Sequence, residues 1–260
     1  MLFEARAYLR HLISAKGPHG VHSPMVFDLI TKILIQDKSF YVFEAIERVR
    51  EDLLQDEHMI HVQDFGAGSR KMKGDQRSVA HIAKFALQPA SHAQALFRLI
   101  DYVRPENILE LGTSLGITSA YLASVAAKTK VWTLEGAPEI ARIAKEVFDV
   151  LNLGNVKVIQ GNFDDQLNMV LQEMGKVDVA VMDGNHRYDP TIRYFNEISP
   201  FLHDDSVVIL DDIHWSAEME KAWNEISRNP KVTLSLDFFH FGVLFFRKGR
   251  VIEHFRLKLP

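Results

Sequence analysis

The sequence contains no cysteine. This absence excludes disulfide bonds, zinc sites built from thiolates, and cysteine nucleophiles. The chain also lacks a clear excess of either charge, because 30 basic residues stand against 34 acidic ones and the formal net charge is only -4. A balance of this kind gives no long-range attraction to nucleic acid or to an anionic membrane, so we expect neither as a partner.

Long apolar runs are missing as well. No stretch of the sequence is long enough to span a bilayer. The N-terminal segment "MLFEARAYLRHLISAKG" is interrupted by Glu4, Arg6 and Arg10, so it lacks the apolar core of a signal peptide. We therefore expect a cytoplasmic protein. Its 260 residues, of which 47% are hydrophobic, are enough for one large α/β domain with a helical extension.

The first part of the chain, residues 1–104, has mostly helical patterns. In "HSPMVFDLITKILI" the apolar residues recur at helical spacing, with Ser23 as the expected N-cap and Pro24 in the first helical position. Further helical patterns cover roughly 40–55, 76–87 and 91–103. The helices at 24–36 and 40–55 are amphipathic and can pack either on the core or on a second subunit, which leaves a homodimer open.

From residue 105 onward, short apolar strands alternate with helical patterns. The strand segments are "NILEL", "KVWTLE", "VKVIQ", "VDVAVMD" and "SVVILDD". We expect a helix through "ITSAYLASVAA", one that begins at Pro138, one through "DDQLNMVLQEM", one capped by Asp189-Pro190, and one capped by Ser216. The alternation predicts an α/β domain over residues 105–260, with a doubly wound, Rossmann-like sheet.

The last two strand segments, "VTLSLDFF" and "GVLFFRKG", follow each other too closely for a crossover helix. They must therefore pair as an antiparallel hairpin. The expected architecture is a mixed Rossmann-like sheet with a C-terminal antiparallel hairpin, preceded by a helical N-terminal region.

Ligands in such folds bind beyond the carboxyl ends of the strands. The first strand runs into "ELGTSLG", and the second ends at Glu135, about 25 residues after Glu110. An acid near this spacing can meet the ribose hydroxyls of a nucleotide. The third strand leads into Gly161, Asn162 and Phe163. The last two can meet an adenine by hydrogen bonding and packing.

Two nucleotide cofactors compete for this loop. A dinucleotide needs the spacing G-x-G-x-x-G, because its pyrophosphate approaches the backbone closely. This chain has Gly112 and Gly116, with Ser114 at the position of the close-approach glycine. S-adenosylmethionine (SAM) has a ribose and an adenine but no phosphate, so the sequence favours SAM over NAD. The expected cofactor-binding residues are Glu110, Gly112, Thr113, Ser114, Gly116, Glu135, Gly136, Gly161, Asn162, Phe163 and Asp183.

A second glycine loop, "DFGAGS" at residues 64–69, also resembles a nucleotide-binding turn. The segment after it provides no second strand that ends in an acid. We expect an ordinary turn there, or a loop that closes over a ligand bound at Gly112–Gly116.

Carboxylates follow two of the predicted strands. Asp183 ends the fourth strand, and Asp211 and Asp212 end the fifth. In the doubly wound order these strands are neighbours, about 4.8 Å apart, so three acids gather at one edge. A divalent cation such as Mg²⁺ would relieve their repulsion, and it could lower the pKa of a substrate hydroxyl. The simpler alternative is that Asp212 caps a local turn and Asp183 bonds the cofactor or the loop backbone.

His186 lies three residues beyond Asp183 in the same loop. Imidazole suits proton removal near neutral pH, so we expect His186 to act as general base beside Asp183. The alternative is a solvated loop histidine, as most of the 12 histidines are expected to be. His214 and Trp215 are further candidates, and Trp215 would pack or line a substrate pocket.

These motifs together resemble class I SAM-dependent methyltransferases, and within them the branch of catechol and caffeoyl-CoA O-methyltransferases. The resemblance covers residues 105–247 and is carried by "ILELGTSLGITSAYLA", "VDVAVMDGNHRYDPTIRYF" and "VVILDDIHWSAEMEKAW". "SHAQALFRLIDYVRP" resembles the family's entry segment to the cofactor pocket. The resemblance implies a metal-binding Asp at Asp183. His186 stands roughly where the family has a basic Lys, and Asp211-Asp212 where it often has Asp-Asn.

The sequence therefore predicts a SAM-dependent O-methyltransferase that is assisted by a divalent cation and acts on a small-molecule hydroxyl. Two alternatives stay open. One is a metal-independent methyltransferase with an oxygen or nitrogen acceptor. The other is a non-catalytic SAM-binding module whose helical N-terminal region contacts a protein partner.

Overall fold

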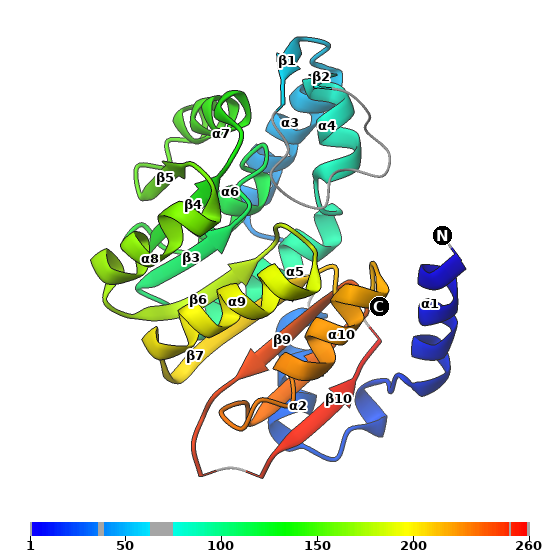
Figure 1. Cartoon of the computed structure of the whole chain (residues 1–260). Helices are drawn as coiled ribbons and strands as arrows, with labels where there is room; N and C mark the ends of the chain where they lie inside the picture. The colour runs from blue at the N-terminus through cyan, green and yellow to red at the C-terminus, as the bar shows by residue number, and fades with distance from the viewer. Residues whose placement is uncertain (1, 36–38, 63–74, 250, 259–260) are drawn as a thin grey trace.

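A computed structural model describes residues 2–35, 39–62, 75–249 and 251–258 of the chain (Figure 1). Its centre is an eight-stranded sheet with the strand order β10-β8-β9-β7-β6-β3-β4-β5. The strands are β3 (Asn107–Leu111), β4 (Lys130–Glu135), β5 (Val156–Gln160), β6 (Val177–Met182), β7 (Leu202–Asp211), β8 (Leu234–Asp237), β9 (Phe241–Phe245) and β10 (Glu253–Arg256). The expected Rossmann-like α/β class is confirmed.

The strands β3 to β7 all pair in parallel, and β9 runs antiparallel to both β7 and β8. The C-terminal hairpin is therefore present as expected. β6 lies between β3 and β7, which is the adjacency inferred from the doubly wound order. The sequence reasoning missed β10, which pairs in parallel with β8 at the edge of the sheet.

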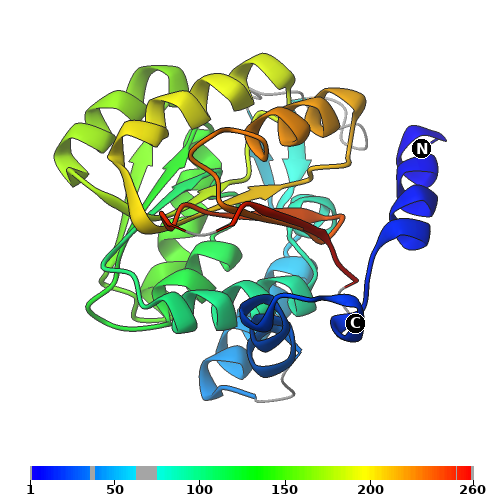
Figure 2. The same ribbon diagram turned by 90° about the horizontal axis from the view of Figure 1, so that it is seen from below.

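Helices cover both faces of this sheet. They are α1 (Leu2–Ser14), α2 (Pro24–Leu29), α3 (Tyr41–Gln55), α4 (Val79–Ala86), α5 (Ala90–Val103), α6 (Ile117–Ala123), α7 (Pro138–Val150), α8 (Phe163–Met174), α9 (Tyr188–Ile198) and α10 (Ala217–Ile226). Figure 2 shows α8, α9 and α10 on one side of the sheet and α2 and α5 on the other. No described helix is long and apolar enough to cross a membrane.

The period-two alternation of the strands divides the core between these two layers. Ile108 packs in a buried cluster with residues of α2 and α5, while its neighbour Leu109 packs with residues of α8, α9 and α10. Successive side chains of a strand point to opposite faces, so both must be apolar when both faces are covered. Every residue of β6 is buried, which explains why its sequence reads as a continuous apolar run.

The N-terminal region differs in detail from the sequence expectations. The helix predicted at 24–36 is α2 followed by a short π-helix, η2 (Ile30–Leu34). Ser23 is at the N-cap, but its hydroxyl donates to Glu253 on β10 rather than capping the helix. The start of the predicted helix 76–87 is strand instead, because β2 (Gln76–Ser78) pairs with β1 (Met59–His61).

Two helix boundaries in the second part also need correction. The helix after "ELGTSLG" ends at Ala123, short of the predicted Ala127. α9 begins at Tyr188, so Asp189 and Pro190 lie in its first turn and the N-cap is Arg187. The predicted cap at Ser216 is confirmed, because its hydroxyl accepts a hydrogen bond from the Met219 N–H at 3.1 Å.

Candidate functional site

The carboxyl ends of four neighbouring strands meet at one edge of the sheet. In the strand register Leu111 faces Leu134 on one side and Met182 on the other, and Met182 faces Leu210. The residues that follow these positions are Gly112, Glu135, Asp183 and Asp211. Register alone therefore places the cofactor loop and the predicted acids side by side.

The loop after β3 crosses the end of β6 at very short range. Gly112 has φ +103°, and an added Cβ would lie 1.9 Å from the carbonyl oxygen of Asp183. Gly116 has φ +84°, and a Cβ there would lie 2.9 Å from the ring of Phe148. Ser114 also takes a left-handed conformation, with φ +48°. Both glycines are thus required by the turn itself, and the loop is bent tightly over the strand ends.

Glu135 is fixed at the opening of this loop by two backbone amides. Its Oε2 accepts from the Ser114 N–H at 2.9 Å, and its Oε1 accepts from the Ala137 N–H, also at 2.9 Å. Gly136 lies between Glu135 and Ala137 in the sequence. The carboxylate is therefore oriented before any ligand arrives, as a ribose-binding acid has to be.

Glu110 lies deeper in the strand and is completely buried. The Thr133 hydroxyl donates to Oε2 of Glu110 at 2.6 Å, and the Ser119 hydroxyl donates to the same oxygen. Oε1 has no hydrogen-bond partner among the described residues. Burial raises the pKa of Glu110 to about 7, against the lowering effect of the two hydroxyls. Thr113 reaches the same network through its hydroxyl, 2.6 Å from that of Thr133.

Asp183 and Asp211 form a pair of carboxyl groups across the ends of β6 and β7, close enough to share a hydrogen bond. Burial, followed by the charges of Asp212 and Glu110, raises the pKa of Asp183 to about 8. Burial and the charge of Asp183 also raise the pKa of Asp211 well above its ordinary value. Two acids in this state hold a proton between them or attract a cation.

The predicted three-ligand metal set is only partly assembled. Asp183 and Asp211 lie together, but no ligand oxygens of Asp183, Asp211 and Asp212 all lie within 4.8 Å of one another in the described parts of the chain. Asp212 has φ +53°, and its carbonyl oxygen accepts from the Trp215 N–H at 2.9 Å. The backbone of Asp212 thus takes part in a local turn, the role that the sequence offered as the simpler alternative. The paired acids still fit a divalent cation in charge and in ligand chemistry.

His186 folds back over this acid pair. Its Nε2 lies 3.5 Å from Oδ1 of Asp183, and its ring centroid lies 5.9 Å from that of Trp215. The side chains of His186 and Asp183 are 23% and 20% exposed, so solvent and small molecules can reach them. Trp215 thus packs against the candidate base, at the place where a pocket wall was expected.

The residues predicted to contact adenine have local structural roles. Gly161 donates its N–H to the Glu135 carbonyl at 2.9 Å, with φ +140°. The Asn162 side chain caps α8 by accepting from the Asp164 N–H at 3.2 Å. The ring of Phe163 lies so close to Gly184 that an added Cβ would be 2.5 Å from a ring carbon. Their contact with adenine stays a prediction.

A polar chain that sequence reasoning missed braces the loop after β6. The Asn185 amide donates to the Tyr194 hydroxyl at 3.2 Å, and that hydroxyl donates to Asp164 at 2.6 Å. The chain links the loop to α9 and α8. Its members are far apart in sequence, and each alone looks like an ordinary surface residue. Only the three-dimensional arrangement identifies them.

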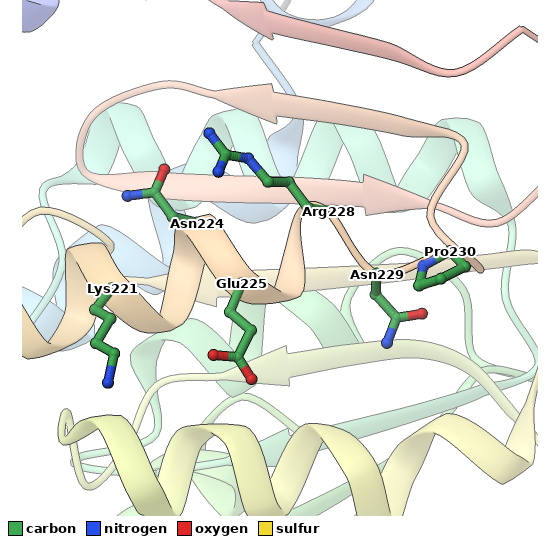
Figure 3. Close-up of a pocket in the computed structure, with 6 residues that line it drawn as sticks. All are labelled: Lys221, Asn224, Glu225, Arg228, Asn229 and Pro230. Atoms are coloured by element: carbon green, nitrogen blue, oxygen red, sulfur yellow. The ribbon is translucent and has the colours of Figure 1, made fainter.

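Two further sequence expectations remain. The loop 64–69 lies outside the described residues. His214 is buried, and its ring points at Asp237 rather than toward Asp183. A shallow depression lined by Lys221, Asn224, Glu225, Arg228, Asn229 and Pro230 lies at the far end of α10, away from the strand ends (Figure 3).

Comparison with known proteins agrees with this geometry. Residues 109–213 match the protein family described as a methyltransferase domain. These residues form a methyltransferase domain by that match. It is 27% identical over 143 residues to the protein-L-isoaspartate O-methyltransferase of Trichlorobacter lovleyi, a match that covers 52% of this chain and 60% of that protein. The chain thus spans less than two thirds of that relative.

Solved methyltransferase structures share the fold. The O-methyltransferase from Bacillus cereus, in complex with S-adenosylhomocysteine (SAH), superposes with a TM-score of 0.54 at 17% identity, covering 81% of this chain and 93% of that one. TomG, an O-methyltransferase of Streptomyces achromogenes in complex with SAM, gives a TM-score of 0.57 at 14% identity, covering 86% and 95%. At such identities the likeness concerns the fold.

Proposed function

We propose that this protein is a SAM-dependent methyltransferase that transfers a methyl group to the hydroxyl of a small molecule with the help of a divalent cation. The observation that carries the proposal is the acid pair Asp183 and Asp211, which lies beside the glycine loop with a histidine over it. The structural relatives that were solved with SAM and SAH support the choice of cofactor.

Each part of the cofactor has residues suited to it. Glu135, held by two backbone amides, offers its remaining lone pairs to the ribose hydroxyls. The tight loop of Gly112, Thr113, Ser114 and Gly116 borders the methionine end of SAM. The buried Glu110 is linked to this loop through the hydroxyls of Thr133 and Thr113. Asn162 and Phe163 lie at the end of β5, next to Glu135, on the side proposed for adenine.

The chemistry requires a deprotonated acceptor close to an electrophilic methyl group, which SAM supplies when bound. A divalent cation held by Asp183 and Asp211 would favour the ionised form of the acceptor hydroxyl. His186 receives the proton at Nε2, and Asp183 at 3.5 Å stabilises the resulting imidazolium. Trp215 bounds the space beside the imidazole and excludes water from that side.

Turnover experiments test this proposal. The full-length protein is incubated with SAM and pooled phenolic, aliphatic hydroxyl and amine acceptors, and SAH release is measured with Mg²⁺ or with EDTA. Acceptor-dependent SAH that requires Mg²⁺ and disappears in EDTA supports the proposed function. Turnover unchanged by EDTA indicates a metal-independent methyltransferase. SAM binding without turnover on any acceptor favours a non-catalytic module.

A further inference from the structure

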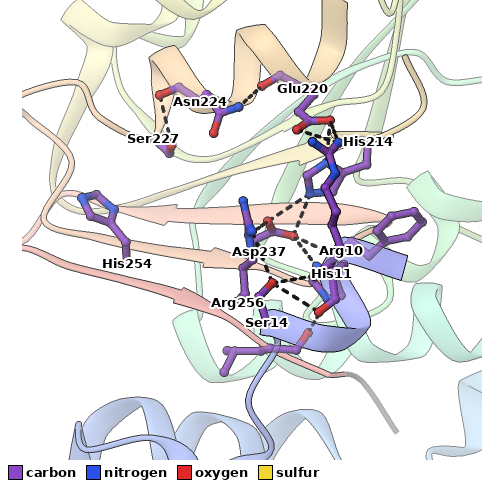
Figure 4. A network of polar contacts seen from close by, with 12 residues as sticks. Arg10, His11, Ser14, His214, Glu220, Asn224, Ser227, Asp237, His254 and Arg256 are labelled. Carbon is purple, nitrogen blue, oxygen red and sulfur yellow. Dashed lines mark hydrogen bonds and ion pairs between the residues drawn. The ribbon is translucent and has the colours of Figure 1, made fainter. Parts of the chain in front are cut away.

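A second buried cluster of ionisable side chains lies outside the proposed methyl-transfer site. It joins His11 on α1, His214 after β7 and Asp237 at the end of β8 (Figure 4). The three residues are only 4%, 5% and 4% exposed, and each offers one ligand atom within 4.8 Å of the others. Three segments far apart in the sequence thus bring two imidazoles and one carboxylate to a single point.

Each imidazole has one nitrogen turned into the cluster and the other toward a supporting acceptor. His11 places Nδ1 3.4 Å from Oδ1 of Asp237, and its Nε2 lies 3.1 Å from the carbonyl oxygen of Leu257. His214 places Nε2 3.0 Å from Oδ2 of Asp237, and its Nδ1 lies 3.8 Å from a carboxylate oxygen of Glu220. Histidines that bind metals direct the outer nitrogen at a carbonyl or a carboxylate, as His11 does. Nδ1 of His214 faces Glu220 but is too far from it for a hydrogen bond.

The spacing of the inner atoms suits a small tetrahedral ion. With bonds of 2.0–2.2 Å, two ligands of a tetrahedral zinc ion lie about 3.3–3.6 Å apart. Oδ1 of Asp237 is the oxygen that both imidazoles share: it lies 3.4 Å from Nδ1 of His11 and 3.2 Å from Nε2 of His214, close to this value.

The cluster is incompletely satisfied as it stands. Nδ1 of His11 is buried and has no hydrogen-bond partner among the described residues. When the Nε2–H of His11 donates to Leu257, a neutral ring turns the lone pair of Nδ1 toward a carboxylate oxygen. This repulsive contact is relieved only by a second proton on the ring or by a cation between the two atoms.

Asp237 is an anion in this environment. Its Oδ1 lies 3.4 Å from Nδ1 of His11, and its Oδ2 lies 3.0 Å from Nε2 of His214. Asp237 also accepts from Arg256 Nε at 3.3 Å and from the Phe239 N–H at 3.0 Å. Arg256 therefore offsets part of the negative charge of the carboxylate.

We propose that His11, His214 and Asp237 bind one Zn²⁺ ion, and that this ion fastens helix α1 to the sheet. Two imidazoles and one carboxylate are a ligand set of zinc, whereas Mg²⁺ prefers oxygen ligands throughout. Figures 1 and 2 both show α1 beside the body of the protein rather than within it. Its other contacts include the exposed ion pair of Arg10 with Glu220 and the ring contact of Tyr8 with Phe239.

Cobalt(II) is the probe, because its visible absorption reports tetrahedral coordination. The metal-stripped full-length protein is titrated with Co²⁺ in excess Mg²⁺, which occupies oxygen-only sites. Zn²⁺ is then added to displace the cobalt. The variants are His11→Gln and Asp237→Asn. The matched control is His254→Gln, since His254 lies on the neighbouring strand β10 and bonds Ser235 instead of the cluster. Asp183→Asn separates this site from the acid pair.

The proposal predicts one tetrahedral Co²⁺ per chain in the unmodified protein, in His254→Gln and in Asp183→Asn. His11→Gln and Asp237→Asn should weaken binding by more than the 10–100-fold typical of supporting residues. Zn²⁺ should also slow hydrogen exchange in residues 2–14, except in His11→Gln. His11→Gln replaces a residue of the peripheral helix, so it keeps the test valid if Asp237→Asn folds poorly. The proposal is overturned by the absence of a tetrahedral signal, or by equal signals in His11→Gln and His254→Gln.

Discussion

Nε2 of His186 lies 3.5 Å from Oδ1 of Asp183, three positions earlier in the same tight loop. Asn185 and His186 both have left-handed backbone conformations, with φ +65° and +37°. Such conformations are costly for residues other than glycine, and they persist where the surrounding structure fixes them, often at functional sites. The loop after β6 is therefore built to hold an imidazole over the acid pair.

We expect His186→Gln to lower the rate of methyl transfer by the 10²–10⁴-fold typical of a general base. SAM affinity should change little, because the proposed contacts to SAM come chiefly from the ends of β3, β4 and β5. The rate should recover in part at higher pH, where the acceptor ionises without help. Single-turnover kinetics and calorimetry on the same preparation separate these effects. A loss of affinity with an unchanged rate would remove His186 from the role of base.

The acid pair predicts a pH-dependent stability. The pKa of Asp183 is about 8 in the folded chain, whereas an aspartate in the unfolded chain titrates near 3.9. Between these values the folded state binds more protons, so stability falls as the pH rises from about 4 to about 8. Glu110, with a pKa raised to about 7, acts in the same direction.

Asp183→Asn should therefore reduce the loss of folding stability that accompanies this rise in pH. Melting temperatures measured at pH 5 and pH 8.5 without metal should differ by several degrees less in Asp183→Asn than in the unmodified protein. Mg²⁺ should reduce the fall in the unmodified protein as well. Asp149→Asn, on the exposed face of α7, is the control. Parallel curves for all three proteins would mean that Asp183 carries no buried proton.

Glu135→Ala should weaken SAM binding by about 1.5–3 kcal/mol, because a hydrogen bond to a charged group is lost and the Ser114 amide is released. SAM and SAH should be affected alike, since they share the ribose. Glu146→Ala is the matched control, as Glu146 forms only an exposed pair with Arg142 on α7. Equal SAM affinities in the two variants would place the ribose elsewhere.

Gly112→Ala tests the crossing of the loop over β6. Its positive φ alone should cost about 1–3 kcal/mol in the free energy of unfolding. The clash with the Asp183 carbonyl, 1.9 Å from the added Cβ, adds to this cost and displaces the acid. Gly175→Ala isolates the first effect, because Gly175 also has a positive φ but nothing lies within 4 Å of its added Cβ. Denaturant unfolding should show the larger loss for Gly112→Ala.

The sequence predicted the strands and the position of the acids well. Apolar runs identified β3 to β7, and the doubly wound strand order placed Asp183 beside Asp211. The antiparallel pairing of β8 and β9 followed from the short connection alone. These features depend on local spacing and on general rules of chain topology.

Other features depend on contacts between distant residues, and the sequence could not reveal them. The outcome at Asp212 is one, because the sequence left both a metal ligand and a local turn open there, and the choice depends on how the loop packs. The cluster of His11, His214 and Asp237 is another, because its members are more than 200 residues apart at the extremes. β10 is short and lies at the edge of the sheet. Its four residues are too few to give a periodic pattern that distinguishes a strand from a loop.

The central claim is that the loop at Gly112–Gly116 with Glu135 binds SAM. Isothermal titration calorimetry of the full-length protein with SAM, SAH and NAD⁺ tests it most directly. We predict saturable binding of SAM and SAH with one site per chain, and no binding of NAD⁺, because the loop lacks the glycine spacing that admits a pyrophosphate. Saturable NAD⁺ binding without a signal for SAM would contradict the account.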